Sequence, residues 1–320
     1  MYENGGRFRR VVMHKVTPLR RHFNSAARLA VRWPAWLLGQ VLPLSARRNL
    51  VSLAGRRKLS VGVEFAMGML DDVRRQDPVG FHRFLWSNHL AYARTYEIPR
   101  RFGASNINPT RHILFSRISD HLRSRGIDPR SDIRSVLDVG CSSGYLLRHL
   151  EELVFPSATI LHGLDIDSYA VQAGSTHLSS LRSRVKLFAA DMEATERTMS
   201  SRNYDLVLCC GVLMYVDETT AEKVVRAMFS CSAHLVGLIC LAPLGDNPVR
   251  SEVRESDGAF IHNMDRMIRR TGGSVVSSTW VGTSTSGSSP CHVILAEPST
   301  KTRHRTPPDR KVGQALSPAN

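Results

Sequence analysis

The sequence predicts an α/β protein: a doubly wound, seven-stranded sheet, mostly parallel with an antiparallel last strand, preceded by N-terminal helices. Three observations predict it. From residue 136 onward, apolar strand-like runs alternate with helical patterns, which is typical of a parallel sheet covered on both faces. The first run, 136–140, leads directly into a turn with two glycines and then into a helix. The last two runs are joined by the short segment 283–289, rich in Ser and Thr, which predicts a hairpin.

The positive charge of the chain is concentrated at its ends. The 320 residues carry a net charge of +15, and residues 1–60 contain 13 Lys and Arg against a single acid, Glu3. Residues 61–300 contain 25 basic and 26 acidic side chains and are therefore nearly neutral. Because this central part lacks the basic stripe of a nucleic-acid enzyme, we do not expect nucleic acid as a partner.

Residues 1–60 form a basic arm that also contains large apolar residues among the charges, such as Trp33, Trp36 and Leu37. Three interpretations fit this composition. The arm is poorly ordered, or it lies on an anionic membrane surface, where cations meet headgroups and indoles sit at the boundary. The third interpretation is an organellar transit peptide, which is also rich in Arg and poor in acids.

The cysteines and the C-terminal tail carry no recognisable site. The six cysteines show no C-x-x-C pair and no metal-ligand spacing with histidine, so we expect reduced thiols, no metal and a cytoplasmic protein. Residues 299–320 have three prolines, many charges and no apolar periodicity, and we expect them to be disordered.

Helical patterns fill the segment before the sheet. Val63 begins a helical apolar pattern that ends at Asp77-Pro78, and a second helix is expected over about 79–96. In that second helix His89, Tyr92 and Tyr96 would share one face, as core residues or as the lining of a substrate pocket. Asn108-Pro109 then begins a third helix, which Gly126 ends.

The strands and helices of the sheet region follow from the apolar runs and their spacing. We expect strands near 136–140, 159–165, 185–189, 204–210, 234–241, 274–281 and 291–297. Helices are expected near 145–154, 168–179, 193–200, 219–230 and 259–271. Because the closing hairpin reverses the chain, we expect one reversed strand at the edge of the sheet.

The turn after the first strand indicates a ligand site. Gly140 and Gly144 have no Cβ, so the backbone between strand and helix can approach a ligand closely. A dinucleotide site would need G-x-G-x-x-G at this place, whereas this turn has only two glycines and follows a carboxylate, Asp138. The pattern therefore departs from NAD binding.

Four motifs in order resemble class I S-adenosylmethionine-dependent methyltransferases, over residues 136 to about 297. They are Val136-Leu-Asp-Val-Gly-Cys-Ser-Ser-Gly144, the run ending at Asp165, the run ending at Asp191, and Tyr204 to Val216. The resemblance implies S-adenosylmethionine as cofactor, with Asp165 on the ribose hydroxyls and Asp191 near the adenine. The implied cofactor-binding residues are Asp138, Gly140, Cys141, Ser142, Gly144, Tyr145, Asp165, Ile166, Asp191, Met192, Cys210 and Gly211. Asp167 stands before a helix, where capping is an alternative to cofactor contact.

Methyl transfer requires alignment of donor and acceptor and, for some acceptors, removal of a proton. The candidates for that catalytic role are His262, Tyr215 and His89. Many family members have His where this chain has Met214, and the Asn/Asp-Pro-Pro-aromatic motif of many amide and nucleobase enzymes is missing. Helices before the core resemble the lids of small-molecule methyltransferases.

We therefore expect a methyltransferase that acts on a small-molecule or lipid-like acceptor. The expected division is 1–60 basic arm, 61–130 helical cap, 131–298 methyltransferase domain and 299–320 tail. Acceptor recognition is expected in 62–125 and 243–262. Two alternatives are an RNA methyltransferase anchored by the arm and a non-catalytic scaffold that binds the cofactor. The acceptor and the oligomeric state are not predicted by the sequence.

Overall fold

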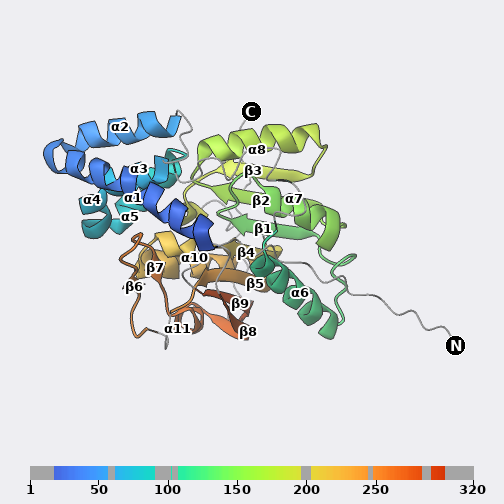
Figure 1. The fold of residues 1–320 in the computed structure, drawn as a ribbon. Coiled ribbons are helices and arrows are strands. Elements are labelled where there is room, and N and C mark those ends of the chain that lie inside the picture. The colour runs from blue at the N-terminus through green and yellow to red at the C-terminus, as the bar shows by residue number, and fades with distance from the viewer. Residues whose placement is uncertain are drawn as a thin grey trace.

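A helical layer formed by α1–α5 precedes the sheet (Figure 1). The structure is a computed structural model that describes residues 18–56, 62–90, 102, 107–195, 203–243, 248–282 and 290–299. The five helices are α1 Pro18–Val41, α2 Leu44–Arg56, α3 Gly62–Met69, α4 Asp71–Gln76 and α5 Pro78–Ser87. Their buried side chains form one apolar cluster, to which Ala35 of α1 and Val51 of α2 belong together with Phe81 of α5.

The division expected at residue 60 therefore falls inside a packed helical layer. Helices α1 and α3 cross at close range, because a Cβ on Gly68 would lie 2.3 Å from the carbonyl oxygen of Arg32. A Cβ on Gly39 would likewise lie 2.7 Å from the carbonyl oxygen of Met69. The part of the basic arm that the structure describes thus packs onto the cap, while residues 1–17 lie outside the described residues.

Two helix predictions in the cap were wrong in their extent. The pattern from Val63 to Asp77 is split into α3 and α4, because Leu70 leaves the helical conformation at φ −118° and ψ 28°. The helix expected over 79–96 ends at Ser87, and His89 has φ +55°. A left-handed residue cannot continue a right-handed helix, so the expected aromatic face does not form at His89. Tyr92 and Tyr96 lie outside the described residues.

The seven-stranded sheet has the order β3-β2-β1-β4-β5-β9-β8. Its strands are β1 Ser135–Val139, β2 Ile160–Asp165, β3 Val185–Ala189, β4 Tyr204–Cys210, β5 Ser232–Leu241, β8 Gly273–Val281 and β9 Cys291–Pro298. Strands β1 to β5 are parallel to one another, and β9 pairs antiparallel with both β5 and β8. The predicted fold class, with an antiparallel last strand, is confirmed.

The reversed strand lies inside the sheet and not at its edge, which corrects one expectation. Strand β9 is inserted between β5 and β8, and β8 is the edge strand. The burial patterns explain this order. Strand β9 has a continuous buried run from His292 to Ala296, as expected for a strand covered on both faces, while β8 shows no such buried run.

Helices cover both faces of the sheet. On one face, Val136 of β1 and Leu161 of β2 pack against three helices: α6 Pro109–Ser124, α7 Tyr145–His149 and α8 Ser168–Ser180. On the other face α10 Glu218–Ser230 and α11 Met264–Arg270 pack around Leu137 and Val207. The side chains of β1 therefore alternate between two apolar layers, which makes the sheet doubly wound.

Two helices differ from their predicted extent. The helix predicted over 145–154 changes after His149 into the π-helical turn η3, Leu150–Val154. The helix predicted over 193–200 stays a prediction, because the structure describes only its start, with the short 3-10 helix η4, Met192–Ala194, while residues 196–202 lie outside the described part. The helix predicted over 259–271 begins only at Met264, because Phe260–Ile261 (β7) pairs with Glu252–Val253 (β6). The predicted disordered tail lies outside the described residues beyond 299.

The described part of the chain contains no helix that is long and apolar enough to span a membrane. All six cysteines are unpaired, and five of them are buried.

Candidate functional site: a pocket at the carboxyl ends of the parallel strands

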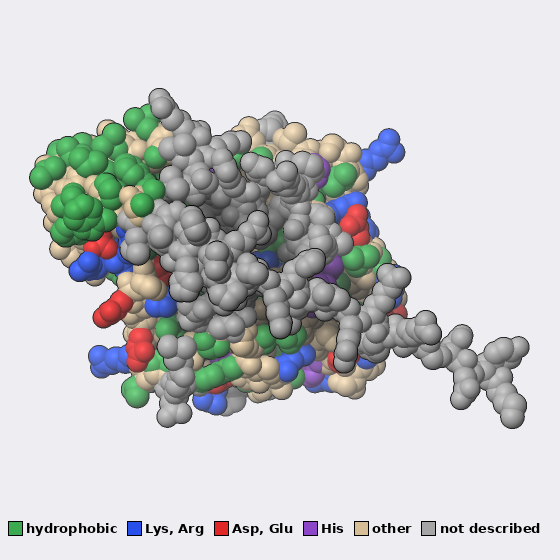
Figure 2. All heavy atoms as spheres, in the orientation of Figure 1, with side chains coloured by type: hydrophobic (Ala, Val, Ile, Leu, Met, Phe, Trp, Pro, Cys, Tyr) green, Lys and Arg blue, Asp and Glu red, His purple; other side chains and the backbone are tan. Residues whose placement is uncertain are grey.

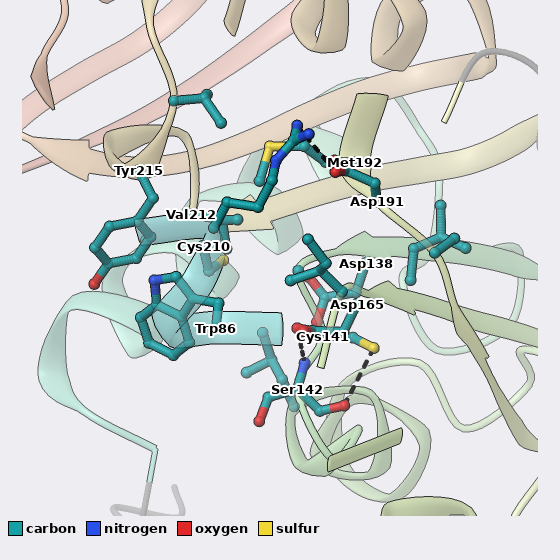
Figure 3. Close-up of a pocket in the computed structure, with 18 of the residues that line it drawn as sticks. Trp86, Asp138, Cys141, Ser142, Asp165, Asp191, Met192, Cys210, Val212 and Tyr215 are labelled. Atoms are coloured by element: carbon teal, nitrogen blue, oxygen red, sulfur yellow. Dashed lines mark hydrogen bonds and ion pairs between the residues drawn. The ribbon is translucent and has the colours of Figure 1, made fainter. Parts of the chain in front are cut away.

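One pocket lies where β1, β2, β3 and β4 end, beneath α5 and the first turn of α6 (Figure 3). It measures about 1060 Å³ including its open mouth. Eleven of the twelve predicted cofactor residues line it, together with Tyr215. The carboxyl ends of parallel strands meet at one edge of a sheet, which is why residues as distant as Asp138 and Cys210 converge here. Gly144 is the exception, since it lies behind the turn.

The turn after β1 is held in a conformation that requires its glycines. Gly140 has φ +82°, and a Cβ there would lie 2.2 Å from Cγ2 of Val212. Gly144 has φ +78° and is the residue before α7, where a Cβ would lie 2.8 Å from Leu187. The bare backbone of Gly140 forms part of the pocket wall, so a cofactor can approach it at a distance that a side chain would prevent.

Asp165 fixes this turn through its carboxylate. Its Oδ2 accepts a hydrogen bond from the backbone N of Ser142 at 2.7 Å, and its Oδ1 accepts one from the backbone N of Asp167 at 2.9 Å. Ser142 has φ +53°, an uncommon conformation that the Asp165 contact supports. Burial raises the pKa of Asp165 to about 6, although these two backbone donors oppose the shift. A carboxylate has about four acceptor positions, so each oxygen keeps capacity for a ligand hydroxyl.

Asp138 points a buried acceptor into the pocket. Among the described residues its Oδ1 has no hydrogen-bond partner, and the residue is only 2% exposed. Burial raises the pKa of Asp138 to about 7, with the Arg111 guanidinium opposing and the Asp165 carboxylate adding to the shift. An unsatisfied buried carboxylate is costly to maintain, so its presence indicates a ligand with a donor group, most simply an ammonium.

The opposite end of the pocket is closed by an ion pair between cap and sheet. Arg83 of α5 reaches Asp191 Oδ2 at 3.1 Å and also pairs with Glu193. Asp191 Oδ1 accepts a hydrogen bond from the backbone N of Glu193 at 3.1 Å and so caps η4. Figure 3 shows Asp191 and Met192 together on one side of the pocket, away from Trp86 and Tyr215.

Aromatic side chains form the remaining wall. The ring centroids of Trp86 and Tyr215 lie 4.8 Å apart (Figure 3). The buried ring of His82 also has its centroid 4.8 Å from that of Tyr215. Burial lowers the pKa of His82 to about 4, so this histidine is neutral at pH 7. Cys210 also lines the wall, and burial raises the pKa of its thiol far above its usual range. Its thiol therefore stays protonated and is not a nucleophile.

Of the three candidate catalytic residues, only Tyr215 lies in the pocket. His262 is 1% exposed, with Nε2 placed 2.9 Å from the carbonyl oxygen of Leu213 and Nδ1 2.6 Å from Oγ of Ser251. Because a carbonyl only accepts, Nε2 carries the proton, and Nδ1 accepts the serine hydroxyl. Both ring nitrogens are thus engaged, and Nε2 holds Leu213, the first residue of the turn η5, Leu213–Tyr215.

His89 also lies away from the pocket wall. Its Nδ1 contacts Asp167 Oδ2 at 2.6 Å, and its ring packs 4.4 Å from that of Tyr169. The other oxygen of Asp167 accepts a hydrogen bond from the backbone N of Ala170 at 2.9 Å, so Asp167 caps α8, which was one of the two roles considered for it. The contact with His89 joins the cap to the sheet region.

Several lining residues were not predicted from the sequence. Arg111 lies in the first turn of α6 with its guanidinium 5.3 Å from the Tyr145 ring, and Arg83 and Trp86 come from α5. The aromatic residues of 79–96 could have indicated Trp86 as a pocket residue, but the helical face predicted for this segment consisted of His89, Tyr92 and Tyr96. None of the described residues of 243–262 lines this pocket, and the acceptor role expected for that region stays a prediction.

The sheet order and the pocket agree with the fold expected from the sequence for a class I S-adenosylmethionine-dependent methyltransferase. Residues 136–233 match the family model described as a methyltransferase domain. The match covers less than a third of the chain, and over that segment the chain is similar to methyltransferase domains.

Individual relatives are distant. A curated malonyl-[acyl-carrier protein] O-methyltransferase of Halalkalibacterium halodurans is 26% identical over 115 residues, which are 36% of this chain and 41% of that protein. The chain therefore spans less than half the length of this curated relative. Magnesium protoporphyrin IX methyltransferase of Synechocystis PCC 6803, solved with bound S-adenosylmethionine, is 16% identical at a TM-score of 0.44 and covers 73% of this chain and 97% of that one. An O-methyltransferase from a trans-AT PKS multienzyme of Brevibacillus brevis is 15% identical at a TM-score of 0.46, covering 67% and 80%.

Proposed function

We propose that this protein binds S-adenosylmethionine in the pocket and transfers its methyl group to a small-molecule or lipid-like acceptor. The observation that carries the proposal is the row of three carboxylates, Asp138, Asp165 and Asp191, along the ends of successive strands in one pocket. Their order along the strand ends, from β1 through β2 to β3, supports a ligand that carries an ammonium, a ribose and a base in sequence. The whole-chain activity is proposed on this basis together with the matched domain.

Different pocket residues would bind different parts of the proposed cofactor, according to their charge. Asp138 Oδ1 would accept from the ammonium group, and Arg111 would pair with the carboxylate of the same amino acid end. Asp165 would accept from the ribose hydroxyls, while Ile166 and Met192 would contact the faces of the adenine. When bound, S-adenosylmethionine supplies an electrophilic methyl group on a sulfonium.

The acceptor is expected between the cap and the end of β4. Val79, Trp86 and Tyr215 offer apolar and aromatic surface there, which favours an acceptor with an apolar portion. The helical cap would then cover the acceptor and exclude water. Tyr215 is the proposed group for orienting the acceptor or taking its proton, and Arg254 interacts electrostatically with its phenol.

Isothermal titration with S-adenosylmethionine and with S-adenosylhomocysteine tests the cofactor site. We expect micromolar binding by the full chain, and no binding would end the proposal. Asp165→Ala should weaken binding at least about 30-fold, because it removes the ribose acceptor and releases the turn at Ser142. The matched control is Asp120→Asn, an exposed carboxylate on α6 that accepts hydrogen bonds from Ser116 and Arg123. Binding without turnover on any acceptor would favour the scaffold alternative.

A further inference from the structure

Helices α1 and α2 present an apolar face to the outside of the protein. Eight large hydrophobic residues on or next to these helices are substantially exposed: Trp33, Trp36, Leu37, Leu38, Val41, Leu44, Leu50 and Leu53. We call this set the α1–α2 apolar face. Figure 2 shows hydrophobic side chains gathered at the upper left, where Figure 1 places these helices. Soluble monomers rarely expose apolar patches of more than a few hundred Å², so this face indicates a contact surface.

The orientation of α1 shows that this exposure is built into its packing. The residues of α1 that face α3 are small, since Ala35 is 1% exposed and Gly39 would clash with Met69 if it had a Cβ. The large residues Trp33, Leu37 and Val41, which recur every four positions, face outward with exposed fractions of 64%, 43% and 76%. An ordinary surface helix has the reverse arrangement, with its large apolar residues facing the core.

The positive charge of the residues around the α1–α2 apolar face indicates which kind of partner would bind it. The first 60 residues carry 13 Lys and Arg and one acid, and no Asp or Glu occurs between Glu3 and Glu64. Two copies of the chain meeting through the same face would bring two strongly cationic arms together, which is repulsive. An anionic lipid surface attracts such an arm and accepts indole and aliphatic side chains at its boundary.

The three arginines of α1 and α2 whose side chains the structure describes are each engaged within the protein. Arg47 is buried and pairs with Asp72 at 2.5 Å, Arg32 lies 3.7 Å from Asp71, and Arg48 lies over the Phe84 ring at 5.6 Å. The described face itself is therefore mainly apolar. RNA binding relies on cations and polar groups along the phosphate backbone, whereas a lipid interface also accommodates exposed indole and aliphatic side chains, so a lipid surface is the better match.

From these observations we infer that the α1–α2 apolar face docks the protein on anionic membranes, lying in the interface without crossing it. Because α1 and α2 share an apolar cluster with α5, the docked surface and the pocket residues Val79 and Trp86 belong to one packed layer. If this layer docks on a membrane, the part of the pocket lined by Val79 and Trp86 would belong to the layer held at the lipid surface. Membrane docking by this face does not depend on methyl transfer.

Vesicle co-sedimentation of the full chain tests this inference. We expect binding to vesicles with about 30% phosphatidylglycerol, and at least about tenfold weaker partition to pure phosphatidylcholine or in high salt. The triple variant Trp33→Gln, Leu37→Gln, Val41→Gln should lose at least about tenfold in partition. A second variant on the other helix, Leu50→Gln with Leu53→Gln, should weaken binding in the same direction.

The matched control replaces three hydrophobic residues that are exposed elsewhere: Leu153→Gln, Val249→Gln and Val253→Gln, at 53%, 78% and 45% exposure. It should bind vesicles like the wild type. All variants should keep the wild-type melting temperature, which shows that they fold. Equal partition of the triple variant and the control would overturn the inference. A second result would also overturn it: the wild type forms a stable dimer in light scattering and does not bind vesicles, and the triple variant is monomeric. The α1–α2 apolar face would then contact a second copy of the chain.

Discussion

Replacement of Asp138 by Asn provides a quantitative test of how the pocket recognises its cofactor. Burial raises the pKa of Asp138 to about 7 in the unliganded protein, so the group is half protonated near neutral pH. An ammonium placed against Oδ1 favours the ionised carboxylate and lowers this pKa by about one to three units. Cofactor binding therefore releases a proton below pH 7, and the affinity must rise as the pH rises through 7.

The expected size follows from the position of this pKa. Below the pKa of the free protein the affinity changes by up to one decade per pH unit, so it should fall about tenfold between pH 8 and pH 6. That change corresponds to about 1.4 kcal/mol of binding free energy. Below pH 6 the decline should steepen, because burial also raises the pKa of Asp165 to about 6. Above about pH 8 the amino group of the ligand loses its own proton, and the affinity should level off or decrease.

Calorimetric titration with S-adenosylhomocysteine from pH 6 to pH 8.5 measures this dependence. In two buffers of different ionisation heat, the wild type should release close to one proton per ligand at pH 6. Asp138→Asn removes the titrating group, so it should bind weakly at every pH and vary less than about threefold between pH 8 and pH 6. The Asp120→Asn control should follow the wild type. A flat wild-type profile, or an identical slope in Asp138→Asn, would refute the assigned contact.

Three further predictions concern stability and the catalytic candidates. Because the folded pKa of Asp138 lies above its unfolded value of 3.8, its charge disfavours folding above that pH, and Asp138→Asn should raise the unliganded melting temperature at pH 8, by several degrees in a thermal scan. Glu151 is 5% exposed, and although burial alone would raise its pKa, hydrogen bonds from Ser183, Arg184 and Arg148 lower the pKa to about 2. Glu151→Gln should therefore lose about 2–3 kcal/mol of unfolding free energy in urea at pH 7. The difference in stability between wild type and variant should vanish as the pH falls from 4.5 toward 2. His89→Ala should lose about 1–2 kcal/mol of stability yet keep its ligand affinity within about threefold, since His89 holds Asp167 and does not line the pocket; a large loss of affinity would contradict this placement.

The sheet and the cofactor end of the pocket could be predicted because local patterns determine them. Strands β3 and β4 have the predicted bounds, since apolar runs flanked by turn residues need little else to be recognised. The position of Asp165 at the end of its strand then follows from topology, as the carboxyl ends of parallel strands meet. The interior place of β9 was also legible in principle, since its run Val293-Ile-Leu-Ala296 is continuously apolar.

The cap side of the pocket could not be predicted, because contacts between residues distant in sequence determine it. The ring of His262 is held by the carbonyl of Leu213, 49 residues away in the chain, and no spacing rule encodes that contact. Helix α5 ends at Ser87 without a proline or glycine to mark its end. The predicted helical face with His89 was therefore wrong. Arg111 enters the pocket only because α6 packs over β5 and β9, an arrangement that its own helical pattern does not specify.

The interior position of β9 determines when the sheet can be completed during synthesis. Strand β5 ends at Leu241, but the strand that pairs with its open edge begins only at Cys291. Strand β8, made earlier, pairs only with β9 among the described strands. A chain released after residue 289 would keep every residue found to line the pocket and still leave two strands without their shared neighbour, with exposed backbone donors and acceptors prone to pairing with other chains. The residues that line the pocket are thus made before β9, while protection of the sheet from aggregation depends on β9.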